Sequence, residues 1–233
     1  MVKLKWMLTS LALAGALSAC GGGSESNGSG QDGTLGVAST NAFNLQSGYQ
    51  AMVRQGYTKT FNLTGSCTGT WTTSATGASS SPLFEGVAAL SSNQITNKNF
   101  YGNCGLPGGQ TFSTQYYNLA ALPVGFSTSG IYGAAGSVPN LPVVAHVGDL
   151  GSIATMNLYT DSTKTDSLGY QTMAYVVSAD TATTALVHIF STRYDSHYAA
   201  VYAQDDVFRI DANGNWTPFR VVAGIGNITI VGY

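Results

Sequence analysis

Few side chains in this sequence are suited to acid–base or nucleophilic chemistry. Its three histidines, His146, His188 and His197, are far apart along the chain, and glutamate occurs only at Glu25 and Glu85. Catalysis near neutral pH usually needs a pair of groups whose pKa values are tuned by burial and by each other. The sequence also lacks a Gly-x-Ser-x-Gly elbow, a Walker loop, a His-Glu-x-x-His pair and a Cys-x-x-Cys motif.

A serine hydrolase can be assembled from the sequence only on paper. Asp149, His188 and any of many serines supply the three residue types of an Asp-His-Ser triad. With so many serines available, this match carries no information about which side chains meet. We therefore predict no catalytic residue, and we leave the question of enzymatic activity open while favouring a non-enzymatic protein.

One segment has polar residues at the spacing of a calcium loop. Asp211, Asn213 and Asn215 alternate, but Trp216 stands where such a loop has glycine, and Val222 stands where it has an acidic residue. A polar type I′ hairpin turn at Asn213-Gly214 explains the same residues more simply. The sequence thus predicts no metal site and no cofactor.

Aromatic residues are the remaining candidates for a binding surface. Trp71, Trp216 and many tyrosines stand among Asn, Gln and Thr, a mixture that can stack on sugars or line an interface. The simpler interpretation is that these rings fill half-buried strand faces. The terminal Tyr233 resembles the end of an outer-membrane barrel strand, but Asn227 and Thr229 share its face and would meet lipid.

The start of the chain carries a specific export signal. After Lys3 and Lys5 an apolar run, residues 6–16, is about half the length that spans a bilayer, and Leu17-Ser18-Ala19-Cys20 follows it. This stretch resembles the lipobox of Gram-negative bacterial lipoproteins. The resemblance implies that the Cys20 sulfur receives a diacylglyceryl group, that the chain is cut before Cys20, and that the new amine is acylated, typically with palmitate.

A Gly/Ser-rich segment follows the lipobox. Residues 21–38 contain almost no apolar side chains, so they cannot bury a core and are predicted to form a flexible tether. In lipoproteins of this family a glycine rather than an aspartate after the lipidated cysteine accompanies export to the outer membrane, and Gly21 fits that pattern. The resemblance therefore implies a lipid-anchored protein of the outer membrane, on its periplasmic or its outer face.

The other two cysteines are predicted to form a disulfide. With Cys20 used for the anchor, Cys67 and Cys104 remain as a pair in an oxidising compartment. Neither has a nearby His or Cys that could complete a metal site. Closing this loop would stabilise the fold by roughly 4 kcal/mol on the chain-entropy model.

Composition favours an all-β domain. Only 9% of residues are charged, against about a quarter in an ordinary globular domain. Ser, Thr, Asn, Gln and Tyr replace them, and this mixture suits pleated strands better than solvated helices. The few basic residues are scattered, which excludes nucleic acid as a partner and electrostatic docking on a membrane.

One helix and a series of strands are expected. Residues 40–55 have an approximately helical apolar stripe, capped by Thr40 or Asn41 and ended by Gly56. Strands are expected at 59–65, 68–76, 83–90, 94–100, 110–119, 152–160, 170–179, 184–194, 198–210, 216–222 and 227–233. Residues 123–142 are predicted to be irregular, with one short strand near 130–133. Short turns between strands imply an antiparallel meander, closed into a sandwich or a partly open barrel.

The sequence therefore divides into three parts with one leading hypothesis of function. Residues 1–19 are the signal peptide, 20–39 the lipidated cysteine and tether, and 40–233 a single β-rich domain. We expect a non-enzymatic envelope lipoprotein with a structural or binding role, held to the membrane through Cys20, whose partner is an envelope protein or a glycan. The alternatives are an envelope hydrolase that acts on polymers and an outer-membrane assembly accessory that pairs through a strand edge.

Overall fold

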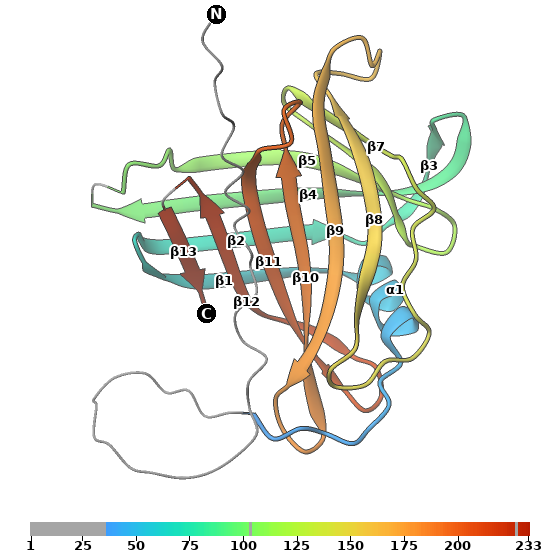
Figure 1. Cartoon of the computed structure of the whole chain (residues 1–233), viewed down its shortest axis with the longest axis vertical. Helices are drawn as coiled ribbons and strands as arrows, with labels where there is room; N and C mark the ends of the chain where they lie inside the picture. Colours follow the sequence, from blue (N-terminus) through green and yellow to red (C-terminus); the bar gives the residue numbers. More distant parts are fainter. Residues whose placement is uncertain (1–35, 103, 227) are drawn as a thin grey trace, which may run out of the picture. The chain divides into compact units, whose positions relative to one another are not determined.

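The structure, a computed structural model, describes residues 36–102, 104–226 and 228–233, and in that part antiparallel strands dominate (Figure 1). One helix, α1 (Leu45–Gln55), precedes them. The strands are β1 (Gly56–Gly65), β2 (Thr68–Thr76), β3 (Ser79–Phe84), β4 (Val87–Tyr101), β5 (Gly109–Tyr117), β6 (Pro123–Thr128), β7 (Ile131–Ala135), β8 (Leu150–Tyr159), β9 (Ser167–Ala179), β10 (Thr184–Tyr194), β11 (Ala200–Asp211), β12 (Trp216–Ile225) and β13 (Ile228–Gly232).

Twelve of these strands form a closed barrel. The strands β4 to β13 pair in sequence order, β13 then pairs with β1, and β1 pairs with β2. The ring closes because β2 pairs with β4 from Thr68↔Tyr101 to Ala75↔Gln94. The predicted all-β antiparallel class with one short N-terminal helix is confirmed, and of the two expected architectures the barrel is the one that forms.

The length of β4 explains how β3 stays outside the ring. The second half of this 15-residue strand pairs with β2, while its first half pairs with β3 across the turn at Glu85 and Gly86. Both turn residues have positive φ, 52° and 77°. The single strand predicted for residues 83–90 is therefore wrong, because this turn interrupts it. The short β3 is left as an edge of the sheet.

The hairpin of β6 and β7 lies in residues 123–142, which the sequence predicts to be irregular apart from one short strand near 130–133. That strand is confirmed as β7, whereas β6 is not predicted. Two glycines that weaken the strand pattern are needed there for packing. A Cβ on Gly125 would lie 2.2 Å from the Phe84 ring, and one on Gly133 would lie 2.5 Å from the Phe126 ring. The glycines thus make room for aromatic rings on the sheet, which is a common reason for glycine within a strand.

The helix α1 begins later than its sequence pattern predicts. Asn44 occupies the N-cap position, and the chain before it is extended, with bridges from Val37 to Asp180 and from Phe43 to Ala145. The predicted end at Gly56 is confirmed, with φ at 73°. Gly48 is retained within the helix because a Cβ there would lie 2.0 Å from the Gly214 carbonyl oxygen. No helix in the described part of the chain is long and apolar enough to cross a membrane.

Apolar side chains form two main clusters inside the barrel. The larger one joins α1 to the inner faces of β8–β12 and includes Phe208 and Trp216. The smaller one joins β1, β2, β12 and β13 around Phe61, Trp71 and Ile230. Cys67 belongs to this second cluster and forms the predicted disulfide with Cys104, with their Cα atoms 5.2 Å apart.

Candidate functional site

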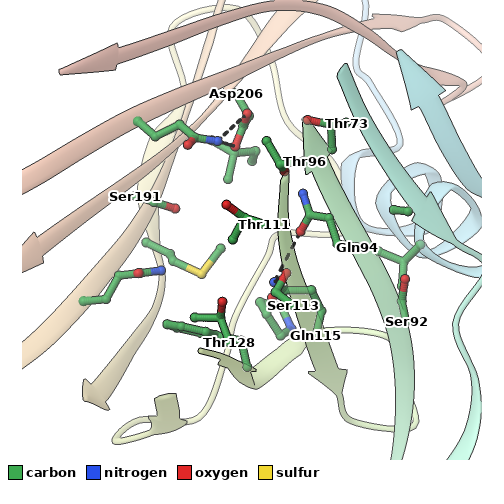
Figure 2. A pocket seen from close by; sticks show the side chains of 18 of the residues that line it. Thr73, Ser92, Gln94, Thr96, Thr111, Ser113, Gln115, Thr128, Ser191 and Asp206 are labelled. Carbon is green, nitrogen blue, oxygen red and sulfur yellow. Dashed lines mark hydrogen bonds between the residues drawn. The ribbon is translucent and has the colours of Figure 1, made fainter. Parts of the chain in front are cut away.

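A cavity of about 460 Å³ lies inside the barrel (Figure 2). Side chains of α1, β1, β2 and β4–β11 line it, so almost the whole circumference of the barrel contributes. Met52 and Phe208 of the larger apolar cluster and Trp71 of the smaller one reach its wall. This volume falls within the range of small-molecule sites in proteins.

The wall of the cavity combines polar and apolar side chains, and the strands β4 and β5 supply many of the polar ones. Successive side chains of a strand alternate between faces, so every second residue of β4 and β5 points inward. The inward residues of β4 are Ser92, Gln94, Thr96 and Lys98, and those of β5 are Thr111, Ser113, Gln115 and Tyr117. Figure 2 shows these hydroxyl and amide groups directed into the same space as Ser191 and Asp206 from the opposite wall.

Several of these polar groups have hydrogen-bonding capacity to spare. Gln115 Nε2 donates to Gln94 Oε1 at 3.3 Å and to Ser113 Oγ at 3.2 Å. The hydroxyls of Thr96 and Ser191 make no hydrogen bond to any residue that the structure describes. A polar molecule in the cavity would therefore find both donors and acceptors, which an apolar core does not offer.

An acidic side chain stands on the β11 wall of the cavity. The Asp206 carboxylate accepts two hydrogen bonds from Gln204 Nε2, each 2.8 Å long. Burial raises the pKa of Asp206 to about 6, a shift that the Gln204 bonds oppose and the neighbouring Asp205 increases. Because the folded-state pKa is above its unfolded value, this group lowers stability as pH rises from about 4 to 6, and the cost is constant above that.

Tyrosines surround the Asp206 end of the cavity. Tyr49 of α1, Tyr57 of β1 and Tyr117 of β5 all reach the wall there, and burial raises the pKa of each phenol. Tyr49 makes an edge contact with the Trp216 ring at 5.6 Å between centroids. These phenols stay neutral and combine an apolar ring with a hydroxyl.

Two cations face the cavity from opposite sides of the barrel. Lys98 of β4 lies over the Trp71 ring, with Nζ 4.0 Å from its centroid. Arg193 of β10 lies 5.4 Å from both the Phe126 and the Tyr202 ring, and its Nε donates to Gln171. Burial and then the nearby Arg193 lower the pKa of the Lys98 ammonium, and burial lowers the pKa of the Arg193 guanidinium.

The cavity reaches the protein surface near these cations. Of its lining residues, Thr111 at the start of β5, Ser129 in the turn between β6 and β7, and Thr76 at the end of β2 are exposed, and the first two lie at the end of the barrel that Lys98 occupies. In the β4–β5 ladder, Lys98 pairs with Gly109, two residues before Thr111. The cationic side chains therefore stand toward the mouth, while Asp206 lies deeper, on the side of α1.

A second cluster lies on the outer face of the barrel. Ser178 of β9, His188 of β10 and Asp205 of β11 occupy diagonal positions on adjacent strands. Ser178 Oγ and His188 Nε2 are 2.9 Å apart, and His188 Nδ1 and Asp205 Oδ2 are 2.8 Å apart. Because a carboxylate only accepts, Nδ1–H donates to Asp205, and Nε2 is left to accept from the Ser178 hydroxyl.

The surroundings of this outer trio differ from those of a hydrolase. Backbone N–H groups of a strand lie in the plane of the sheet, whereas the Ser178 hydroxyl projects from its face, so the ladder offers no oxyanion hole above it. Only 14% of the His188 and Asp205 side-chain surface is exposed. The second Asp205 oxygen, Oδ1, and Nε of Arg220 are buried without a hydrogen-bond partner in the described part of the chain.

The other predicted residues do not converge. The Asp-His-Ser triad considered from the sequence pairs Asp149 with His188. In the structure, Asp149 instead accepts a hydrogen bond from the backbone N–H of His146, three residues earlier. His197 lies in the turn between β10 and β11, where Asp195 accepts its backbone N–H. Among the described residues no three His, Cys, Asp or Glu side chains are placed to hold a metal ion.

The calcium-like segment is a hairpin turn. Asp211 Oδ1 accepts from the backbone N–H groups of Asn213 and Asn215, and Asn215 Nδ2 donates to Oδ2. The predicted hairpin is confirmed, but the type I′ assignment is wrong, since only Gly214 has positive φ. Its N–H bonds to the Asp211 carbonyl, as in a type I turn followed by a glycine bulge.

Sequence reasoning missed Lys98, Arg193 and Asp206. One feature of the sequence could have indicated a polar interior, because β4 and β5 carry polar residues at both odd and even positions. A half-buried strand normally shows one apolar face. Two polar faces on adjacent strands indicate that the interior they face contains polar groups or water.

Comparison with known proteins does not assign this chain to a family. No family model, curated protein or solved structure matches the chain. Cys20, the predicted lipidation site, lies outside the described residues, as do the signal peptide and most of the predicted tether. Functional inference for the β domain therefore depends on the side chains of the barrel.

Proposed function

We propose that this protein is a lipid-anchored, non-enzymatic binding protein of the outer membrane, and that its barrel takes up a small polar molecule. The polar cavity carries the proposal for the barrel domain. Lining groups such as Thr96 and Ser191 are free to hydrogen bond to a guest, and filling the barrel with apolar side chains would have stabilised the fold more simply. The lipobox ending at Cys20 carries the proposal for the anchor.

The outer face of β1 and β2 is consistent with attachment through Cys20. On the outer face of β1 and β2, Thr60 and Thr72 hydroxyls bond to each other at 2.8 Å, and Thr58 donates to Ser74 at 3.0 Å. Strands that face lipid instead present an apolar band. Water is thus the favoured environment for this face, and the lipid anchor would hold the domain to the membrane.

The cavity hypothesis can be tested by blocking the cavity. Ser191→Trp places a large ring on the inward face of β10, and the matched variant Thr192→Trp places the same ring on its outward face. We expect at least one class in a panel of neutral sugars, sugar acids, sugar phosphates and amino acids to raise the melting temperature of full-length protein in detergent. The shift should persist in Thr192→Trp and disappear in Ser191→Trp.

Two outcomes would contradict the binding proposal. One is an absence of any shift in the wild-type protein across the whole panel. The other is an equal shift in Ser191→Trp and the wild type, since the guest would then bind elsewhere.

The second candidate is a hydrolase, and the outer trio is the observation that favours it. The distances of 2.9 and 2.8 Å that join Ser178, His188 and Asp205 fall within the range of a nucleophile–base–orienter triad. In an acyl transfer at this site, Ser178 Oγ would attack a carbonyl carbon, the carbonyl electron pair would move to its oxygen, and His188 Nε2 would take the hydroxyl proton. The carbonyl would then re-form as the bond to the leaving group broke, and His188 would give its proton to that group. The missing oxyanion donors make this the weaker candidate.

A fluorophosphonate probe distinguishes the two candidates. We expect intact-mass measurement to show no covalent adduct on the folded wild-type protein, because a Ser178 hydroxyl without oxyanion stabilisation is a poor nucleophile. Ser178→Ala and His188→Gln serve as references. An adduct on Ser178 that both substitutions abolish would establish a reactive triad and favour the hydrolase.

A further inference from the structure

The two cations of the cavity have no carboxylate to neutralise them. Among the described residues the ion pairs are Lys164–Glu85, Arg209–Asp180, His188–Asp205 and His146–Asp149, and neither Lys98 nor Arg193 takes part. Asp206 does not compensate them. It faces Ile189 across the β10–β11 ladder, four residues along β10 from Arg193, and its own hydrogen bonds go to Gln204.

Both cations keep donors that a guest could use. The Lys98 ammonium contacts the Trp71 ring but makes no hydrogen bond to a described residue, and Arg193 uses only Nε, toward Gln171. Neither side chain has a nitrogen that is both fully buried and without a partner. The three ammonium protons and the terminal guanidinium nitrogens therefore remain accessible from the cavity.

Holding two like charges in one cavity is costly unless an anion lies between them. Lys98 and Arg193 line the cavity from opposite walls, and both are partly buried, so repulsion between them is less screened than at the surface. The aromatic rings of Trp71, Phe126 and Tyr202 hold the cations in place and offset part of this cost. A guanidinium and an ammonium arranged in this way match a carboxylate or a phosphate group.

From these observations we infer that the guest of the barrel is a small hydroxylated anion, such as a sugar acid or a sugar phosphate. Its anionic group binds between Lys98 and Arg193 near the mouth. Its hydroxyl-bearing body lies deeper, against the Thr, Ser and Gln side chains of β4, β5 and β10. This inference rests on the proposed binding function and specifies the chemical class of the ligand.

Calorimetric titration with matched probes tests the inference. Full-length protein in detergent is titrated with glucuronate, glucose 6-phosphate, glucose and inorganic phosphate. We expect one or both sugar anions to bind at least about tenfold more tightly than glucose, since a charged hydrogen bond contributes that much. Comparison of glucuronate with glucose 6-phosphate identifies which anionic group is preferred. Inorganic phosphate should bind more weakly than the preferred sugar anion, because it lacks the hydroxylated body.

Substitutions then locate the anionic group. Lys98→Met and Arg193→Met keep the apolar stems that cover the aromatic rings, and each should weaken sugar-anion binding at least about tenfold while leaving glucose unaffected. Lys59→Met is the matched control, because Lys59 lies over the Phe61 ring, 5.7 Å from its centroid, and does not line the cavity. The melting temperatures of the three variants are measured as well. Values close to that of the wild type would exclude misfolding as the cause of weaker sugar-anion binding.

The results separate this inference from the proposed function. If glucose binds as tightly as the sugar anions, or if Lys98→Met and Arg193→Met bind them as well as the wild type does, the anionic ligand is wrong and the polar binding cavity stands. If none of the four probes binds, the anionic ligand is again wrong. The cavity proposal is then tested by the melting-temperature shifts of the wild type and Ser191→Trp across the wider panel of small molecules.

Discussion

Replacing Cys67 with serine is expected to lower the free energy of unfolding by about 4 kcal/mol. The disulfide to Cys104 closes a loop of 37 residues, and the chain-entropy model gives this value for a loop of that length. The bond ties the turn between β1 and β2 to the connection that follows β4, beside the apolar cluster of Phe61 and Trp71. Thermal unfolding followed by circular dichroism should show a melting temperature lower by about 10 °C.

Two controls make this prediction specific. Cys104→Ser should destabilise the protein as much as Cys67→Ser, because either change removes the same bond. Cys20→Ala, which replaces the third cysteine without touching the disulfide, should leave the melting temperature of the β domain unchanged. If reductant has no effect on wild-type unfolding, or if folded unreduced protein shows two alkylatable thiols at these positions, the bond is not formed in solution.

Replacing Cys20 with alanine is expected to release the protein from the membrane fraction. The lipobox predicts a diacylglyceryl group on the sulfur and a further acyl chain on the amine, each anchoring at about 0.8 kcal/mol per buried methylene. Several such chains make dissociation of the wild type negligible. Cell fractionation, together with incorporation of a clickable palmitate analogue, measures both the location and the lipid.

A tether substitution provides the matched control for the anchor. Ser24→Ala alters the Gly/Ser-rich segment without changing the lipobox, so this variant should stay in the membrane fraction and incorporate the label. Should Cys20→Ala remain membrane-bound to the same extent as Ser24→Ala, the anchor assignment would be wrong. Attachment through the barrel itself would then have to be considered.

Strand positions were predictable wherever local chemistry is unambiguous. The predicted bounds of β2 and β10 agree with the structure, since both strands combine β-branched residues with clear turn residues at their ends. Errors occur at β6, where Gly125 leaves room for the Phe84 ring, and at Gly86, which forms the turn that divides β3 from β4.

The candidate sites were much less predictable than the strands. The sequence marks Trp71 as a candidate binding aromatic and His188 as a residue type that could carry chemistry, but it does not indicate which residues they contact. Ser178 and Asp205 meet His188 only through diagonal positions on three paired strands. A shift of one residue in either register would send a side chain to the opposite face.

By itself, the sequence predicted an export signal, which stays a prediction, and it determined the pairing of Cys67 with Cys104 and a chain made of antiparallel strands behind one helix. The signal, the helix and the strands depend on local sequence patterns. The disulfide follows because only two cysteines remain once Cys20 is assigned to the anchor. The tertiary structure alone decided that β2 closes onto β4, and therefore which face of each polar strand is interior. The physical reason is that β4 is polar on both faces, so alternation cannot tell inside from outside. Closure of the ring makes that choice, and it places Lys98, Arg193 and Asp206 around one cavity.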